Sequence, residues 1–121
     1  MSDDPISYQD VLELEHAYVR AKAALDQVEI RNGYPAYPKV VSELMKSLSE
    51  GKWGNKGYDP RKTKEQIENI DSADMNICTS ILTSCSRGER FSDGHWKNVL
   101  QSDIFDKVIA RAKELTDPGT L

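Results

Sequence analysis

The segment Arg87–Trp96 gathers most of the side chains in this 121-residue chain that could do chemistry. It holds two arginines, two acids, a histidine and two aromatics within ten residues. Arg87 and Arg90 could bind a phosphate or a carboxylate, because the guanidinium fork matches both groups. The start of the helix expected after them would add backbone N–H groups, and Trp96 could stack on a base. With His95 beside them, these residues form the first candidate for an anion- or nucleotide-binding site.

The same segment also fits a structural role as a corner between two helices. Gly88 would end one helix and Asp93 would cap the next. Phe91 and Trp96 would then enter the core as aromatic anchors. A carboxylate at the cap also occupies N–H donors that a phosphate would need. The residue types favour this structural role over the binding role.

The irregular stretch 51–64 is the second candidate site. It contains three glycines, one proline, two aromatics and five basic residues against one acid. The basic residues, interleaved with the two aromatics, could hold a polyanion by charge and stacking. They are Lys52, Lys56, Arg61, Lys62 and Lys64, with Trp53 and Tyr58. Alternatively, the two aromatics pin a solvated loop to the body. The formal net charge of −4 favours that alternative and argues against general nucleic-acid binding.

Catalysis and metal binding find little support in the residue pattern. The chain has no nucleophile-elbow, phosphate-loop, dinucleotide-binding or zinc-protease motif. Its two histidines, His16 and His95, and its two cysteines show no metal-ligand spacing. Cys78 and Cys85 stand seven apart on one expected helix, where about 10.5 Å separates their Cα atoms, too far for a disulfide. We therefore expect no catalytic residue, no metal site and no cofactor.

A long first helix is expected near 7–29. Its apolar residues follow alternating steps of three and four, which is the spacing of a heptad seam. Such a seam is either the core side of the helix or an interface with a second copy of the chain, and both alternatives are open. The candidate interface residues are Val11, Leu14, Tyr18, Ala21 and Leu25.

The rest of the chain also has helical spacing, and no segment alternates with period two, as a strand would. Helices are expected near 38–50, 73–87 and 94–100 and from 103 onward, with a short helical piece at 63–70. The expected caps are Ser72, Asp93, and either Ser102 or Asp103. The sequence thus predicts an all-α, compact single domain over 1–121: a bundle of about five helices with one ordered basic loop and a short tail at 116–121.

Two motifs together resemble a known family. They are Tyr34–Pro38 followed by Trp53 and Tyr58–Pro60, and the segment Arg87–Trp96. In order and spacing they are similar to domain of unknown function 6508, found in small prokaryotic and phage-type proteins, over roughly 33–115. Members often have a cysteine where this chain has Ser92, so no reactive thiol is expected there. The resemblance implies a fold and the place of a site, and no activity.

Two function classes stay open from the sequence. The first is a non-catalytic binding protein that holds a small anionic or nucleotide-like ligand between the corner and the basic loop. The second is a protein–protein or inhibitory module that acts through the first helix, and an enzyme is third. The first class requires loop and corner to converge in space, and the second requires an exposed apolar patch on the first helix. Sequestration of a signal molecule fits the size and family setting alone.

The sequence also indicates where in the cell the protein is located. No apolar run is long enough to span a bilayer. The acidic, polar start carries no secretory signal. A cytoplasmic protein without a membrane partner is therefore expected.

Overall fold

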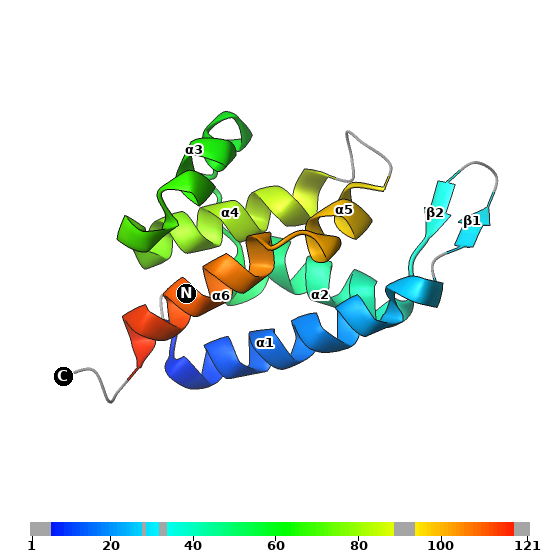
Figure 1. The fold of residues 1–121 in the computed structure, drawn as a ribbon, viewed down its shortest axis with the longest axis horizontal. Coiled ribbons are helices and arrows are strands. Elements are labelled where there is room, and N and C mark those ends of the chain that lie inside the picture. The colour runs from blue at the N-terminus through cyan, green and yellow to red at the C-terminus, as the bar shows by residue number, and fades with distance from the viewer. Residues whose placement is uncertain (1–5, 28, 32–33, 89–93, 118–121) are drawn as a thin grey trace.

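The computed structural model describes residues 6–27, 29–31, 34–88 and 94–117. Within these ranges most residues lie in α-helices, which confirms the all-α class (Figure 1). The helices are α1 Tyr8–Ala23, α2 Lys39–Ser49, α3 Thr63–Glu68, α4 Met75–Arg87, α5 His95–Gln101 and α6 Ile104–Thr116.

The first helix begins at a reciprocal cap and ends earlier than its apolar spacing predicts. The Ser7 hydroxyl accepts a hydrogen bond from the Asp10 backbone N–H at 3.1 Å, and the Asp10 carboxylate accepts one from the Ser7 N–H at 2.8 Å. The chain leaves α1 after Ala23 and forms a 3-10 turn over Ala24–Gln27. Leu25 is still buried in that turn, so the apolar spacing runs past the end of the helix.

A small hairpin follows the 3-10 turn. Strand β1, Glu29–Arg31, pairs antiparallel with strand β2, Tyr34–Ala36. It lies at one end of the long axis of the molecule (Figure 1). Strands of three residues are too short to show a period-two pattern, and this is why the sequence did not predict them.

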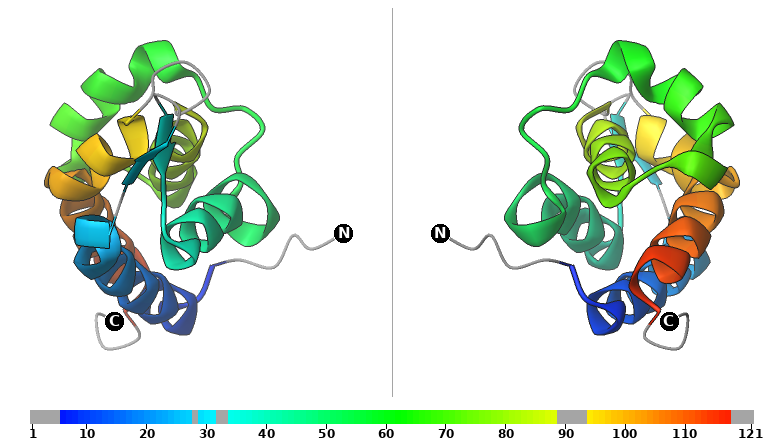
Figure 2. Two further views of the ribbon diagram at one scale, coloured as in Figure 1. Left: turned by 90° about the vertical axis from the view of Figure 1, so that its right-hand side faces the viewer. Right: turned by 90° about the vertical axis from the view of Figure 1, so that its left-hand side faces the viewer.

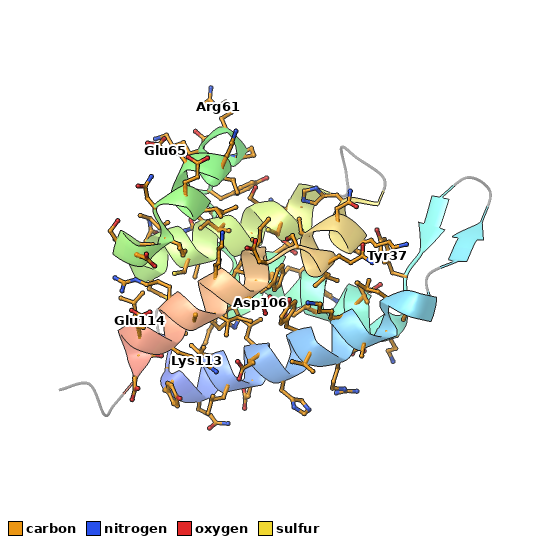
Figure 3. All side chains as sticks on the ribbon, in the orientation of Figure 1. Tyr37, Arg61, Glu65, Asp106, Lys113 and Glu114 are labelled. Carbon is orange, nitrogen blue, oxygen red and sulfur yellow. The ribbon has the colours of Figure 1, made fainter. Side chains whose placement is uncertain are left out.

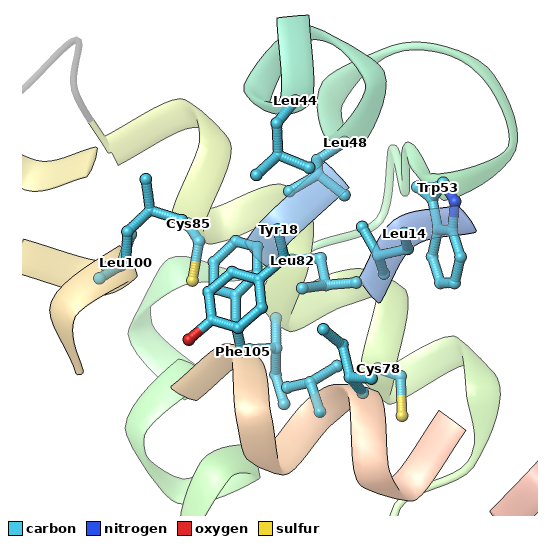
Figure 4. Close-up of a cluster of buried hydrophobic side chains, with 14 of the residues drawn as sticks. Leu14, Tyr18, Leu44, Leu48, Trp53, Cys78, Leu82, Cys85, Leu100 and Phe105 are labelled. Atoms are coloured by element: carbon cyan, nitrogen blue, oxygen red, sulfur yellow. The ribbon is translucent and has the colours of Figure 1, made fainter. Parts of the chain in front are cut away.

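The core lies between α1, α2, α4 and α6. α1 packs against α2 and α6, and α4 packs against the same two helices. Tyr18 of α1 stacks on Phe105 of α6 with ring centroids 5.1 Å apart, near the middle of the core (Figure 4). In the end views, α3 lies on the far side of α4 from α1 (Figure 2). None of the side chains of α3 is buried.

The heptad seam of α1 belongs to this core. Val11 and Ala21 have no exposed surface, and Leu14, Tyr18 and Leu25 are at most 5% exposed. Side chains buried within one chain cannot contact a second copy while the fold persists. The prediction of an interface through these five residues is therefore corrected, and the alternative, a seam that packs on its own chain, describes the structure.

Of the caps that follow, the one expected at Ser72 differs, and the one expected at Ser102 or Asp103 is confirmed. Ser72 lies inside a 3-10 turn, and Asp74 caps α4 instead, its carboxylate accepting a hydrogen bond from the Ile77 N–H at 2.9 Å. Asp103 holds the cap position of α6, but the Ser102 hydroxyl makes the bond, accepting from the Ile104 N–H at 3.3 Å.

The start of α5 is described only from residue 94 onward. Gly94 occupies the cap position with φ +85°, a left-handed conformation that glycine adopts at low cost. The expected cap Asp93 lies outside the described residues.

None of the helices in the part of the chain that the structure describes has the length and apolar content needed to cross a bilayer.

Candidate functional site

An open cavity of about 680 Å³ lies between α3 and the neighbouring ends of α4, α5 and α6. Tyr58 and Pro60 line it from the basic loop, and Arg87, Gly88 and His95 line it from the corner. The two candidate segments of the sequence therefore meet in space, as a ligand site between them requires.

Arg87 stands where loop and corner join. Its guanidinium carbon lies 5.4 Å from the centre of the Tyr58 ring, within the range of a cation–π contact. One terminal nitrogen donates a hydrogen bond to the Ser49 carbonyl oxygen at 3.3 Å. The buried Nε has no hydrogen-bond partner among the described residues. A guanidinium has five N–H donors, and the bond to Ser49 uses one of them.

His95 forms the adjoining part of the wall by packing against Gly88. A Cβ built on Gly88 would lie 2.2 Å from His95 Nε2, so only a glycine leaves space for the ring. The Nε2 atom is buried and has no partner within the described ranges. His95 therefore lines the cavity, while its Nε2 is covered by protein.

Four residues of α3, Ser84 of α4 and Ile104 of α6 also line the cavity, and the sequence pattern did not single them out as site residues. Ile67 of α3 and Ile104 of α6 present apolar side chains to it. Thr63 of α3 donates a hydrogen bond from its hydroxyl to that of Ser84 at 2.9 Å. An isoleucine at helical spacing looks the same in sequence whether it meets a core or a cavity, so no local signal could identify these residues.

The two tryptophans expected as ligand contacts lie elsewhere. Trp53 is only 8% exposed and belongs to the hydrophobic core, so it pins the loop to the body (Figure 4). Trp96 donates from its indole nitrogen to the Ser86 carbonyl oxygen at 2.8 Å and packs at a tilt on the Tyr37 ring. It lines a second hollow of about 380 Å³, to which Arg87 also contributes.

Of the basic residues of the loop, Lys64 lines the cavity, whereas Lys52, Lys56, Arg61 and Lys62 do not. Arg61 is exposed and pairs with Asp59 at 3.1 Å, and its hydrogen bonds hold the pKa of the Asp59 carboxyl below its usual value. Its side chain points away from the core helices (Figure 3). Lys56 is exposed, and Lys52 pairs with Asp10 at 2.9 Å. The expected grip on a polyanion by Lys56, Arg61, Trp53 and Tyr58 together is therefore not what the structure forms.

Of the other site candidates, Arg90 lies outside the described residues, and so does Phe91. Neither cysteine offers a reactive thiol, because burial raises the pKa of Cys78 to about 11 and that of Cys85 to about 12. No group of three or more potential metal ligands occurs among the residues that the structure describes.

A further hollow lies on the opposite face of α3. Its volume is about 300 Å³, and Glu65 and Gln66 contribute to it. The residues of α3 thus divide between two hollows: Ile67 faces the large cavity and Glu65 the small one.

Comparison with known proteins places the chain in a family. The model of the Family of unknown function (DUF6508) matches residues 10–118, which adds almost all of α1 to the region that the sequence motifs indicate. None of the curated proteins or solved structures matches the chain.

Proposed function

The chain belongs to the DUF6508 family, and we propose that it is a non-catalytic binding protein that holds a small anionic, for example nucleotide-like, ligand in the cavity beneath α3. One observation carries the proposal: Tyr58 and Arg87, which are 29 residues apart in sequence, form one wall of an open cavity of about 680 Å³. Cavities of this size, with mainly apolar walls and a few polar groups, are typical of small-molecule sites.

The charge at this wall supports an anionic ligand. Within the described residues, Arg87 takes part in no ion pair. The Tyr58 ring and the Ser49 carbonyl hold its guanidinium in place without neutralising it. A carboxylate or phosphate in the cavity would supply the missing partner.

The proposal is for binding because the polar groups among the described lining residues show no catalytic arrangement. The hydroxyls of Thr63 and Ser84 are bonded to each other, so neither is activated by a base. The proposed site of action is this cavity and not α1, and the proposed location is the cytoplasm.

Filling the cavity tests the proposal. In Ile67→Trp, an indole occupies space that the ligand would use, whereas Glu65→Trp adds the same group on the opposite face of α3 (Figure 3). Native mass spectrometry of the gently purified chain should show a bound small molecule, which Ile67→Trp loses and Glu65→Trp retains. Circular dichroism confirms that both variants fold. A chain that carries no adduct, or an adduct that Ile67→Trp keeps, would contradict the proposal.

A further inference from the structure

Resting on this proposed function, we infer that the ligand is an amphiphilic mono-anion. It has an apolar aliphatic or aromatic body and a single carboxylate or comparable acidic group, in contrast to a nucleoside di- or triphosphate. Three features of the cavity carry the inference: its charge, its apolar walls and the placement of the loop cations.

The described walls hold few charges. Lys64 and Glu68 are exposed, one turn apart on α3, and opposite in sign. Arg87 is the remaining charged residue among the described lining groups, so the fixed charges sum to +1. His95 adds no donor at Nε2, because that atom is buried against Gly88. One negative charge balances this wall, whereas a di- or triphosphate would leave several charges unpaired in a partly desolvated site.

The rest of the described cavity surface is mainly apolar and favours an apolar ligand body. Ile67 and Ile104 face it from α3 and α6, and Pro60 and the Tyr58 ring face it from the loop. The Thr63 hydroxyl donates its hydrogen bond to the Ser84 hydroxyl and not to the cavity. A ribose or a second phosphate would find few partners here, while burial of an apolar body is favourable in proportion to its area.

Except for Lys64, the basic side chains of the loop that a polyphosphate would need either pair with carboxylates or do not line the cavity. Lys52 pairs with Asp10, and Arg61 pairs with Asp59. Lys56 is exposed and does not line the cavity. Of the basic residues of the loop, only Lys64 lines the described part of the cavity wall.

Displacement of the fluorescent probe 8-anilinonaphthalene-1-sulfonate from the full chain tests the inference. Octanoate, octan-1-ol and octylammonium share one apolar body and differ in charge, and ADP represents the polyphosphates. We expect octanoate to displace the probe at a concentration about tenfold lower than octan-1-ol does, as one added charge-assisted contact provides. Octylammonium should be weaker than octan-1-ol, and ADP should not displace the probe in the range where octanoate does.

Two variants assign the effect to the cavity. Arg87→Met should reduce octanoate to the level of octan-1-ol, whereas Lys56→Met removes the same charge from an exposed position and should keep the tenfold difference. The comparison of the three octyl compounds on the unaltered chain does not depend on the folding of Arg87→Met.

The outcomes separate the inference from the function on which it rests. Equal displacement by the three octyl compounds, or stronger displacement by ADP that Ile67→Trp abolishes, overturns the mono-anion and leaves a small-molecule site in place. If Ile67→Trp changes no displacement at all, the cavity is not a binding site and both proposals fail.

Discussion

The imidazole of His95 lies so close to Gly88 that no side chain fits between them. A Cβ on Gly88 would be 2.2 Å from Nε2 and 2.3 Å from Cδ2 of that ring. Gly88 has φ −63° and ψ −24°, a right-handed conformation open to any residue. The position therefore requires glycine for space and not for backbone freedom, and the contact ties the end of α4 to the start of α5.

Gly88→Ala should destabilise the chain by about 1–3 kcal/mol, the usual cost of overpacking. His95→Ala in the same chain should recover part of that loss, because it removes the atoms that clash. Urea unfolding of the two single variants and the double variant measures the coupling. Gly57→Ala is the matched control, since the nearest atom to its Cβ is 3.5 Å away. Strictly additive effects of the two substitutions would contradict the contact.

Thr83 is a buried hydroxyl that joins three segments of the chain. It accepts a hydrogen bond from the Asn55 N–H at 2.9 Å and lies 3.2 Å from the carbonyl oxygens of Leu48 and Trp53. Thr83→Val keeps the shape but leaves these groups without their partner, at a cost of about 1–3 kcal/mol. The Asn55 amide proton should shift strongly in the NMR spectrum of Thr83→Val and little in that of Thr83→Ser. An unchanged shift in the valine variant would show that the bond is absent.

Leu14 and Val19 lie on opposite sides of α1, with exposed fractions of 3% and 58%. Leu14→Ala should lower the free energy of unfolding by about 2–5 kcal/mol, because it leaves a cavity in the core. Val19→Ala should change it by no more than about 0.5 kcal/mol. A double variant, Leu14→Glu with Leu25→Glu, should not fold. If size-exclusion chromatography instead shows a folded monomer where the unaltered chain is an oligomer, the seam is an interface.

Asp10 gives the stability of the chain a dependence on acid pH. The Ser7 N–H and the Lys52 ammonium bond its carboxylate and hold its pKa below the usual 3.8. Because the folded pKa is depressed, the stabilisation is present above the usual value and is lost as pH falls through the folded pKa. Asp10→Asn should therefore lose less stability than the unaltered chain between about pH 5 and pH 2. Asp71→Asn, at an exposed carboxyl, should behave like the unaltered chain in the same unfolding series.

Local patterns predicted the helices because their apolar faces and caps are short-range features. The stripe at Val41, Leu44 and Leu48 predicted α2 to within a residue at either end, and all three side chains are buried. The end of α1 could not be predicted in this way, because a 3-10 turn keeps Leu25 in register with the core. The sequence pattern predicts Ser72 as the cap of α4, but Asp74 stands nearer to the first apolar residues of the helix and makes the bond.

The cavity could be predicted only in part, because contacts across the fold decide which residues reach it. Sequence spacing marked Arg87 and Tyr58 separately, but their mutual contact depends on the path of the chain between them. Trp53 has the residue type of a stacking platform, and packing against the core decides its role. Arg61 finds its carboxylate two residues away, a pairing visible in sequence that removes it from the ligand candidates.

The hollows on both faces of α3 also affect dynamics. This helix has six residues and buries none of them, whereas α4 buries eight. The free energy that keeps α3 in place is therefore a small part of the total, and α3 can open locally while α1, α2, α4 and α6 stay together. The amide hydrogens of α3 would exchange with solvent deuterium through that local opening. Those of α4 would exchange only when the whole chain unfolds. The affinity of any molecule seated beneath α3 is then its intrinsic affinity multiplied by the fraction of time that the helix is closed.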